Sequence, residues 1–127
     1  MVLGKAVTVA GLGCRRGVSA AEVLAAVAAT RAARGVGALD ALATVPAKRD
    51  EPALAEAARR LGLPLMVVAP ADDSRLATRS AASRGATGAG SASEASALAA
   101  AGEGGRLLGP RLVVGRVTCA IAVGAAP

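Results

Sequence analysis

The sequence predicts a single α/β domain over residues 1–127, a three-layer α/β/α arrangement around a mixed β-sheet. Short apolar runs typical of buried strands alternate with helical patterns in the order β-α-β-α-β, which favours parallel strands joined by helices. A further helix and two closing strands follow, over residues 106–108 and 116–123 around a turn at Gly109-Pro110, and they make the sheet mixed. The length of 127 residues suits one domain with one core.

The first half of the chain predicts a strand, a helix and a second strand. Residues 6–11 and 39–45 are short apolar runs that are expected to form strands. Between them, residues 19–34 place apolar side chains on one helical face until a glycine ends the pattern. Ser19 and Glu22, three residues apart, form a capping box that fixes the start of this helix.

A second helix and a third strand come next. Residues 46–52 form a charged loop, with Asp50 as the expected N-cap and Pro52 in the first helical turn. The helix is expected to end at Gly62, and residues 65–69 form the third strand.

The following region predicts less regular structure before the last helix. A short helix is expected near residues 74–78, followed by a mobile loop over about 78–90 that is rich in Ser, Gly and Ala. A second capping box, Ser91 with Glu94, is expected to open a helix that runs to about Ala101. We expect these two residues to act as caps.

Residues 11–19 read Gly-Leu-Gly-Cys-Arg-Arg-Gly-Val-Ser and are expected to form a tight glycine loop between the first strand and the first helix. Glycine allows a positive φ, which we expect at Gly13. Arg15 and Arg16 would lie beside free amides and the positive end of a helix, which together predict an anion-binding site. A plain turn with solvated arginines is the alternative. Ligands of such sheets bind outside the carboxyl ends of the strands, where this loop and residues 46–51 should meet.

Two nucleotide-binding motifs do not fit this loop. The dinucleotide pattern G-x-G-x-x-G requires a third glycine where Arg16 stands, and Gly17 comes one residue late. The acidic residue expected about 20 residues later could only be Asp40, which precedes its apolar run. A Walker loop requires Gly-Lys-Ser/Thr, which is absent from the sequence.

Charge and composition limit the partners. The chain has 15 Lys and Arg against 9 Asp and Glu, a net charge of +6, which suits nucleic acid, an anionic membrane, or a phosphate or polycarboxylate ligand. Single-stranded nucleic-acid binders stack bases on aromatic rings, and this chain has none, although duplex backbone binding remains open. We therefore expect a small anionic ligand and no nucleic acid.

The absence of histidine excludes a Ser-His-Asp triad, a Cys-His pair and an imidazole metal site within the chain. Cys14 and Cys119 are too far apart in sequence for a metal-ligand spacing, and we expect two free thiols, no metal and no cofactor. The sequence shows no signal peptide, and no uninterrupted apolar run reaches the ~18 residues of a membrane span. We expect a cytoplasmic protein without a membrane partner.

Four stretches of the chain, taken in order, are similar to the sequence pattern of one known family. Residues 11–19 are similar to its opening pattern G-x-G-C-R-R/K-G, and residues 43–54 to a later segment with a Lys and two acidic positions. Residues 90–98 are similar to a helix start ending E-A-A-A-L, and residues 107–122 to a closing segment ending V-T-x-A-I-A. The chain therefore resembles the CobE / CbiG C-terminal domain family of cobalamin biosynthesis. Pro46, Arg111 and Arg116 depart from the family pattern, which usually has an acidic residue, Lys and Asn there.

The resemblance implies a role on the corrin ring. The full-length relative of the anaerobic pathway is a cobalt-precorrin-5A hydrolase, which opens a lactone, releases acetaldehyde and carries additional N-terminal sequence. A stand-alone domain resembles the CobE branch of the aerobic route. The expected partners are a tetrapyrrole (a precorrin or corrin) and other cobalamin-pathway enzymes. Two alternatives stay open: a non-catalytic regulatory or docking subunit, and a lactone-opening activity, although we do not expect catalysis by this chain alone.

The expected ligand-binding residues combine the glycine loop with positions carried over from the resemblance. They are Gly11, Gly13, Cys14, Arg15, Arg16, Gly17, Ser19, Lys48, Glu51 and Arg111. Cys14 and Glu51 are the candidates for catalysis, and Asp50, expected as a helix cap, is a further group that could supply a base. A thiol beside two arginines at a helix N-terminus could be a nucleophile, but a small buried residue filling the turn is the favoured interpretation. Lys48 and Glu51 either reach the ligand or form a surface ion pair with each other.

Overall fold

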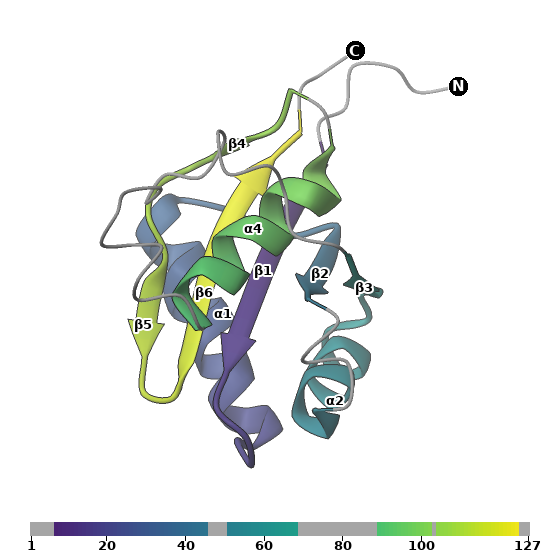
Figure 1. Ribbon diagram of the computed structural model, residues 1–127, viewed down its shortest axis with the longest axis vertical. Helices are drawn as coiled ribbons and strands as arrows, with labels where there is room; N and C mark the ends of the chain where they lie inside the picture. Colours follow the sequence, from purple (N-terminus) through teal and green to yellow (C-terminus); the bar gives the residue numbers. More distant parts are fainter. Residues whose placement is uncertain (1–6, 46–50, 69–88, 103, 125–127) are drawn as a thin grey trace.

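The computed structural model describes residues 7–45, 51–68, 89–102 and 104–124 (Figure 1). In chain order, the elements are β1 (Thr8–Cys14), α1 (Ala20–Arg34), β2 (Ala41–Thr44), α2 (Pro52–Leu61), β3 (Leu65–Val67), α4 (Ala89–Ala101), β4 (Arg106–Leu107), β5 (Leu112–Val114) and β6 (Val117–Val123).

The strands form one mixed sheet in the order β3-β2-β1-β6-β4, and β5 also pairs with β6. β1, β2 and β3 run parallel to one another. β6 is antiparallel to β1, from Thr8 opposite Val123 to Cys14 opposite Val117, and also to β4 and β5. The longest strands, β1 and β6, therefore form the centre of the sheet.

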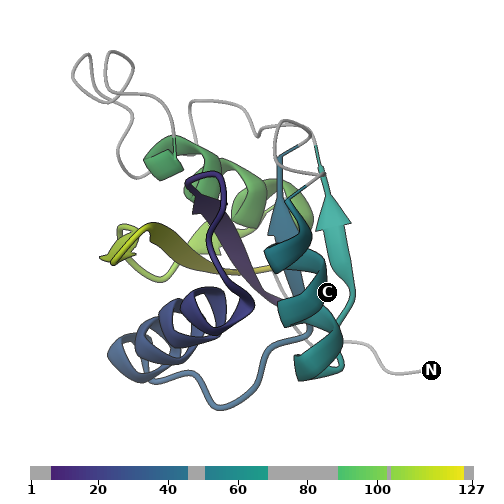
Figure 2. The ribbon, with the colours of Figure 1, turned by 90° about the horizontal axis from the view of Figure 1, so that it is seen from below.

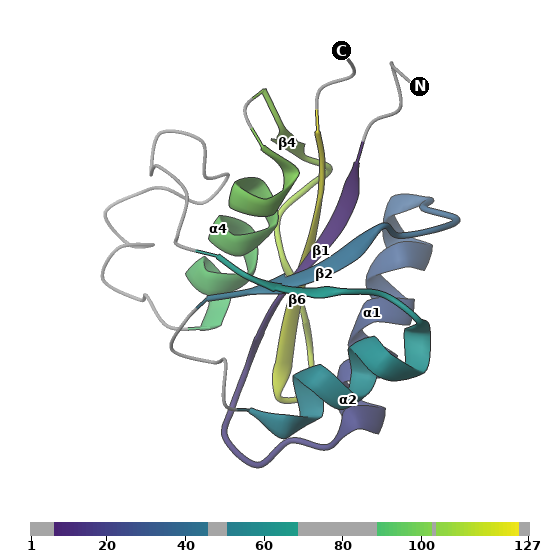
Figure 3. The ribbon, with the colours of Figure 1, turned by 90° about the vertical axis from the view of Figure 1, so that its right-hand side faces the viewer.

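Helices cover both faces of this sheet. α1 and α2 lie on one face and α4 on the other, as the edge-on view of Figure 3 shows and the view from below in Figure 2 confirms. The three-layer α/β/α architecture with a mixed sheet, expected from the sequence, is confirmed.

The two faces of the sheet carry side chains of different size. On the face covered by α1 and α2, buried strand residues such as Leu12, Leu42 and Ile121 pack with apolar residues of both helices. On the face covered by α4, the strands present mainly small residues. These residues are Val9, Gly11, Gly13, Ala41, Ala43, Thr118, Ala120 and Ala122.

Small residues on the α4 face let the helix approach the strand backbone. A Cβ at Gly11 would overlap the backbone oxygen of Ser93 and would stand 2.7 Å from the backbone nitrogen of Ala97. Glycine is required here because the backbone of another element occupies the space of a side chain. The close packing of α4 on β1 therefore depends on the residue at position 11.

The helix boundaries expected in the first half of the chain are largely confirmed. α1 follows Ser19 as its N-cap, with both bonds of the capping box formed to Glu22. Gly35 ends α1 and Gly62 ends α2, each in the left-handed conformation. The N-cap of α2 is Glu51, not Asp50, and its side chain makes no capping bond. Asp50 itself lies outside the described residues.

The expected glycine loop is too long at its N-terminal side. Gly11, Gly13 and Cys14 belong to β1, and the connection to α1 is only residues 15–19. Gly13 does not have a positive φ, contrary to the expectation; within this stretch the positive φ is at Gly17. The glycines at positions 11 and 13 have the two-residue period of one strand face.

The last helix begins earlier than expected. α4 already includes Ala89 and Gly90, so the expected mobile loop over about 78–90 is wrong at its C-terminal end. Its remaining part, like the short helix near residues 74–78, lies outside the described residues. The second capping box is also wrong, because Ser91 is inside the helix and Glu94 is completely buried.

The closing hairpin contains one more strand than the sequence predicted. β5 pairs with β6 across a turn at Gly115-Arg116, with Gly115 at φ +61°. The expected turn at Gly109-Pro110 is instead an interruption between β4 and β5, both of which pair with β6. Among the described residues, no helix has the length and apolar character needed to cross a membrane.

Candidate functional site

The turn between β1 and α1 carries the two arginines singled out by the sequence. Arg15 and Arg16 are exposed, whereas Val18 is buried and anchors the turn to the core. The backbone N–H of Arg15 donates to the carbonyl of Arg116 at 3.1 Å, which ties the turn to the β5–β6 hairpin. Gly17 takes a φ of +85°, a conformation that glycine adopts without strain.

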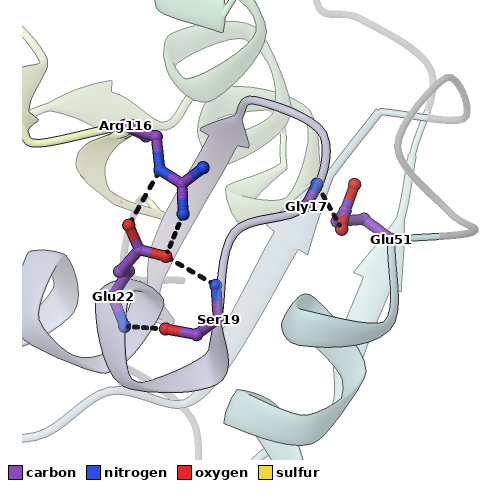
Figure 4. A network of polar contacts seen from close by, with 5 residues as sticks. All are labelled: Gly17, Ser19, Glu22, Glu51 and Arg116. Atoms are coloured by element: carbon purple, nitrogen blue, oxygen red, sulfur yellow. Dashed lines mark hydrogen bonds and ion pairs between the residues drawn. The ribbon is translucent and has the colours of Figure 1, made fainter.

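The start of α1 is held by a network of polar contacts (Figure 4). The backbone N–H of Ser19 donates to Glu22 Oε2 at 2.7 Å, and the backbone N–H of Glu22 donates to Ser19 Oγ at 3.2 Å. Arg116 donates to both carboxylate oxygens of Glu22, from Nε at 2.9 Å and from Nη2 at 2.7 Å. Glu22 thus acts both as a helix cap and as the partner of Arg116, which lies in the turn between β5 and β6.

This network fixes the charges of its members. Hydrogen bonds from Arg116, and then from the Ser19 backbone, lower the pKa of Glu22 from 4.5 to about 2. The same pairing raises the pKa of Arg116. Both groups are ionised at neutral pH, and the positive charge of Arg116 is already balanced by its bidentate partner.

Among the described residues, the guanidinium groups of Arg15 and Arg16 have no such partner. Within the described part of the chain, the ion pairs are Arg59–Glu56, Arg60–Glu56 and Arg116–Glu22. Among the described residues, no carboxylate therefore balances the charges of Arg15 and Arg16 in the β1–α1 turn.

The loop before α2 reaches the same turn. Glu51 Oε2 accepts a hydrogen bond from the backbone N–H of Gly17 at 3.3 Å (Figure 4). This contact confirms that the two loops meet beyond the carboxyl ends of β1 and β2. Glu51 is the described residue of the second loop that makes it. The contact also shows that an amide of the expected anion site is held by a carboxylate of the protein itself.

The structure brings together Arg15, Arg16, Gly17, Ser19 and Glu51, five of the residues expected at the site. Gly11 lies further along β1 beneath α4, and Gly13 accepts a hydrogen bond from Thr118 Oγ1 through its carbonyl at 3.3 Å. Cys14 is 1% exposed and packs in the core with α1 and α2, as the favoured interpretation of this residue expected. Lys48 lies outside the described residues.

Arg111 lies apart from the turn. It precedes Leu112, which is opposite Cys119, whereas Cys14 is opposite Val117. Along the strand direction, Arg111 is therefore three residues from the level of Cys14, about 10 Å. The backbone N–H of Arg111 donates to Glu94 Oε2 at 3.0 Å, and Glu94 is 0% exposed.

Glu94 was expected as a cap at a helix end, but it lies inside α4 and is completely buried. A signal was present: α4 consists of Ala, Gly, Ser and Leu with this single acidic residue. A helix of small residues can pack closely on several sides, which leaves an acidic member little access to water. The second role of Glu22, as the partner of Arg116, joins residues 94 positions apart, which no local pattern reveals.

The second thiol, Cys119, is free and buried. Burial raises the pKa of the Cys119 thiol from 9.0 to about 11, with a hydrogen bond to Thr30 opposing the shift. Among the described residues, no group of three or more His, Cys, Asp or Glu side chains is placed to hold a metal ion.

The sequence matches the family model described as "Cobalamin synthesis G C-terminus" over residues 8–122. This match covers most of the chain and decides its family. The chain belongs to the cobalamin synthesis G C-terminal family. The resemblance stated from the sequence is confirmed, and with it a place among proteins of cobalamin biosynthesis.

Solved structures agree with this family. The chain is 50% identical to the cobalamin biosynthesis protein chiG from Agrobacterium tumefaciens, covering 93% of this chain and 98% of that one, with a TM-score of 0.73. It is 36% identical to CobE, a protein from the cobalamin (vitamin B12) biosynthetic pathway, covering 100% and 96%, with a TM-score of 0.83. A cobalamin biosynthesis protein G homolog from Sulfolobus solfataricus has the same fold, at 16% identity and a TM-score of 0.68, with 92% of this chain and 36% of that chain covered. No curated protein sequence matches the chain.

Proposed function

We propose that this protein binds a polycarboxylated tetrapyrrole intermediate of corrin biosynthesis at the carboxyl edge of β1. The observation that carries the proposal is the pair of exposed guanidinium groups of Arg15 and Arg16, which have no carboxylate partner among the described residues. Family membership supplies the pathway. The acetate and propionate arms of a precorrin supply the matching charges.

The chemistry of the turn supports carboxylate binding. An arginine guanidinium matches the geometry of a carboxylate with two parallel hydrogen bonds. Such charge-assisted bonds are worth about 1.5–3 kcal/mol each. The N-terminus of α1 adds a favourable field for an anion. The N–H of Gly17 already donates to Glu51 Oε2, so the guanidinium groups are the donors left for the carboxylates of the ligand.

The test compares two double variants of equal charge change. Cobyrinic acid, a corrin that carries seven carboxylates, is titrated into wild type, Arg15→Ala/Arg16→Ala and Arg59→Ala/Arg60→Ala at moderate salt. Arg59 and Arg60 are exposed on α2 and pair with Glu56, so this variant controls for net charge. We expect the first variant to bind at least about tenfold more weakly, a difference of about 1.4 kcal/mol, and the control to bind like wild type.

Cyanocobalamin, whose peripheral side chains are amides, serves as the ligand without carboxylates. We expect weak binding to every variant. Equal affinity of the two arginine variants for cobyrinic acid would overturn the proposed site. Failure of wild type to bind cobyrinic acid would instead favour the regulatory or docking subunit, with another pathway enzyme as partner.

Lactone hydrolysis is the second candidate, and we do not expect it from this chain alone. Efficient hydrolysis needs a positioned base and a stabilised oxyanion, each worth a factor of about a hundred or more. The chain has no histidine, and Cys14 is buried in the core. Among the described residues, Glu51 is the remaining candidate base. The assay is acetaldehyde release from a lactone-bearing precorrin: release that disappears in Glu51→Gln would make the protein an enzyme.

A further inference from the structure

The edge of the sheet opposite β3 contains a bulge, which separates β4 from β5. β4 pairs with β6 up to Leu107 opposite Ala122, and β5 resumes with Leu112 opposite Cys119. Between these pairs, the edge strand advances five residues while β6 advances three. We call residues 108–111 the β4–β5 bulge.

Two charged side chains hold this bulge from opposite layers of the fold. From α1, Arg34 Nη2 donates to the carbonyl of Pro110 at 2.7 Å, and its guanidinium lies against Gly109. A Cβ at Gly109 would stand 2.5 Å from Arg34 Cζ. From α4, on the other face of the sheet, Glu94 Oε2 accepts the N–H of Arg111 at 3.0 Å.

The N–H of Arg111 is bonded to α4 and not to a neighbouring strand. Leu108 still donates its N–H to Ile121 of β6, as a regular edge residue does. Arg111 donates instead to a fully buried carboxylate, and burial of a carboxylate is costly unless such bonds compensate it. This arrangement fixes the backbone of one residue, Arg111, at the edge of the sheet.

The side chain of Arg111 takes no part in the ion pairs of the described residues. Bulges commonly re-aim a side chain beside a functional site. Arg111 lies about 10 Å along the sheet from the level of the β1–α1 turn. A macrocycle with carboxylate arms on its whole circumference is a ligand that can engage arginines at two separate places.

We propose that Glu94 and Arg34 are positioning residues that hold the β4–β5 bulge so that Arg111 binds a second carboxylate of the same ligand. This inference rests on the proposed function, because it assigns a further contact to the tetrapyrrole that Arg15 and Arg16 bind. Glu94 and Arg34 act through Arg111 and do not contact the ligand.

A double-mutant cycle with cobyrinic acid as probe tests this dependence. We expect Arg111→Ala and Glu94→Ala each to weaken binding about tenfold. We expect the double variant Glu94→Ala/Arg111→Ala to bind no more weakly than Arg111→Ala alone, because coupled residues are not additive. Glu94→Gln keeps an acceptor oxygen for the N–H of Arg111 and should retain wild-type affinity within about twofold.

Gly109→Ala tests the other side of the clamp with Glu94 intact. Its Cβ displaces the Arg34 guanidinium, so we expect weaker binding, and it carries the test if Glu94→Ala does not fold. Gly37→Ala is the matched control, because a Cβ there meets no atom within 4 Å and the φ is not positive. Unfolding midpoints of all variants confirm that folded protein is being titrated.

The outcomes separate this inference from the proposed function. If Arg111→Ala binds like wild type while Arg15→Ala/Arg16→Ala binds weakly, only the role of the bulge is overturned. If Glu94→Ala weakens binding equally with and without the Arg111 side chain, Glu94 has a general structural role and the inference fails. Absence of binding by wild type overturns both.

Discussion

Gly11 and Leu12 are neighbours in β1, yet they face opposite layers and differ in the size of side chain that their surroundings admit. Leu12 is completely buried among side chains of the α1 and α2 face. Gly11 lies under the backbone of α4, where no side chain fits. One face is therefore filled by side-chain volume, and the other by the close approach of a helix to a strand.

This difference shows how a chain without aromatic residues builds a dense core. Large aliphatic side chains fill the space on one face. On the other face, small residues let α4 approach the strands so closely that little space is left to fill. Interiors are packed to the density of organic crystals, so neither face tolerates a change in size. The α4 face should fail when residues grow, and the α1 and α2 face when they shrink.

Gly11→Ala should have the largest effect. The added methyl group overlaps the backbone oxygen of Ser93, which cannot rotate away, so α4 must separate from β1. We expect a loss of more than about 3 kcal/mol in the free energy of unfolding, beyond ordinary overpacking. Urea unfolding followed by circular dichroism measures it, with Gly37→Ala as a control that should match wild type. A Gly11→Ala protein of unchanged stability would contradict the close approach of α4.

Leu12→Ala tests the other face. Truncation leaves a cavity among the buried side chains of the α1 and α2 face, and we expect a loss of about 3 kcal/mol. Leu12→Met, which conserves volume, should cost less than about 1.5 kcal/mol. The same urea titration compares the two variants. If both lose the same stability, filling of volume is not what Leu12 contributes.

The thiols report on the α1 and α2 face without any mutation. Cys14 and Cys119 are both buried in its core, so we expect a disulfide-exchange reagent to label neither in folded protein at pH 8 and both in denaturant. Because the pKa of Cys119 is raised to about 11, the unfolded state loses this proton first as the pH rises. Stability should therefore fall from about pH 9 toward 11, less so in Cys119→Ala. Fast labelling at pH 8 would show that this face opens locally.

Glu22→Gln should have the smallest effect, at a region that belongs to neither face. The pKa of Glu22 lies near 2 in the folded protein, so its contribution is present above pH 4.5 and disappears as the pH falls toward 2. The exposed Glu22–Arg116 pair is screened by solvent, so we expect only a small difference from wild type at pH 7. Urea midpoints at pH 7, 4 and 2 should converge at the lowest pH. A difference that persists at pH 2 would exclude the charge as its cause.

The sequence predicted the layers, the mixed sheet and α1 because their signals are local. Ser19 and Glu22 are three residues apart, and Gly35 directly follows the helix that it ends. The error at Gly11 and Gly13 had a physical reason. Glycine serves both a positive φ and a close backbone approach, and at Gly11 the position of α4 shows that it serves the second.

The candidate site was predictable in part for the same reason. Arg15 and Arg16 lie in the turn that the pattern around them indicated, and Glu51 reaches it as expected. The contacts of Glu94 with Arg111 and of Glu22 with Arg116 join residues 17 and 94 positions apart. Such pairs depend on the register of β6 against its neighbours, which no local pattern specifies.

The antiparallel pairing of β1 with β6 also determines how the domain can be connected to other polypeptide. Val7 and Gly124 are side by side, with the N–H of Gly124 donating to the Val7 carbonyl at 2.7 Å, whereas the β1–α1 turn lies at the opposite end of the sheet (Figure 1). A linker attached at either residue would leave the fold away from Arg15 and Arg16. The architecture thus allows the domain to be joined to another polypeptide at one end, with Arg15 and Arg16 at the other end.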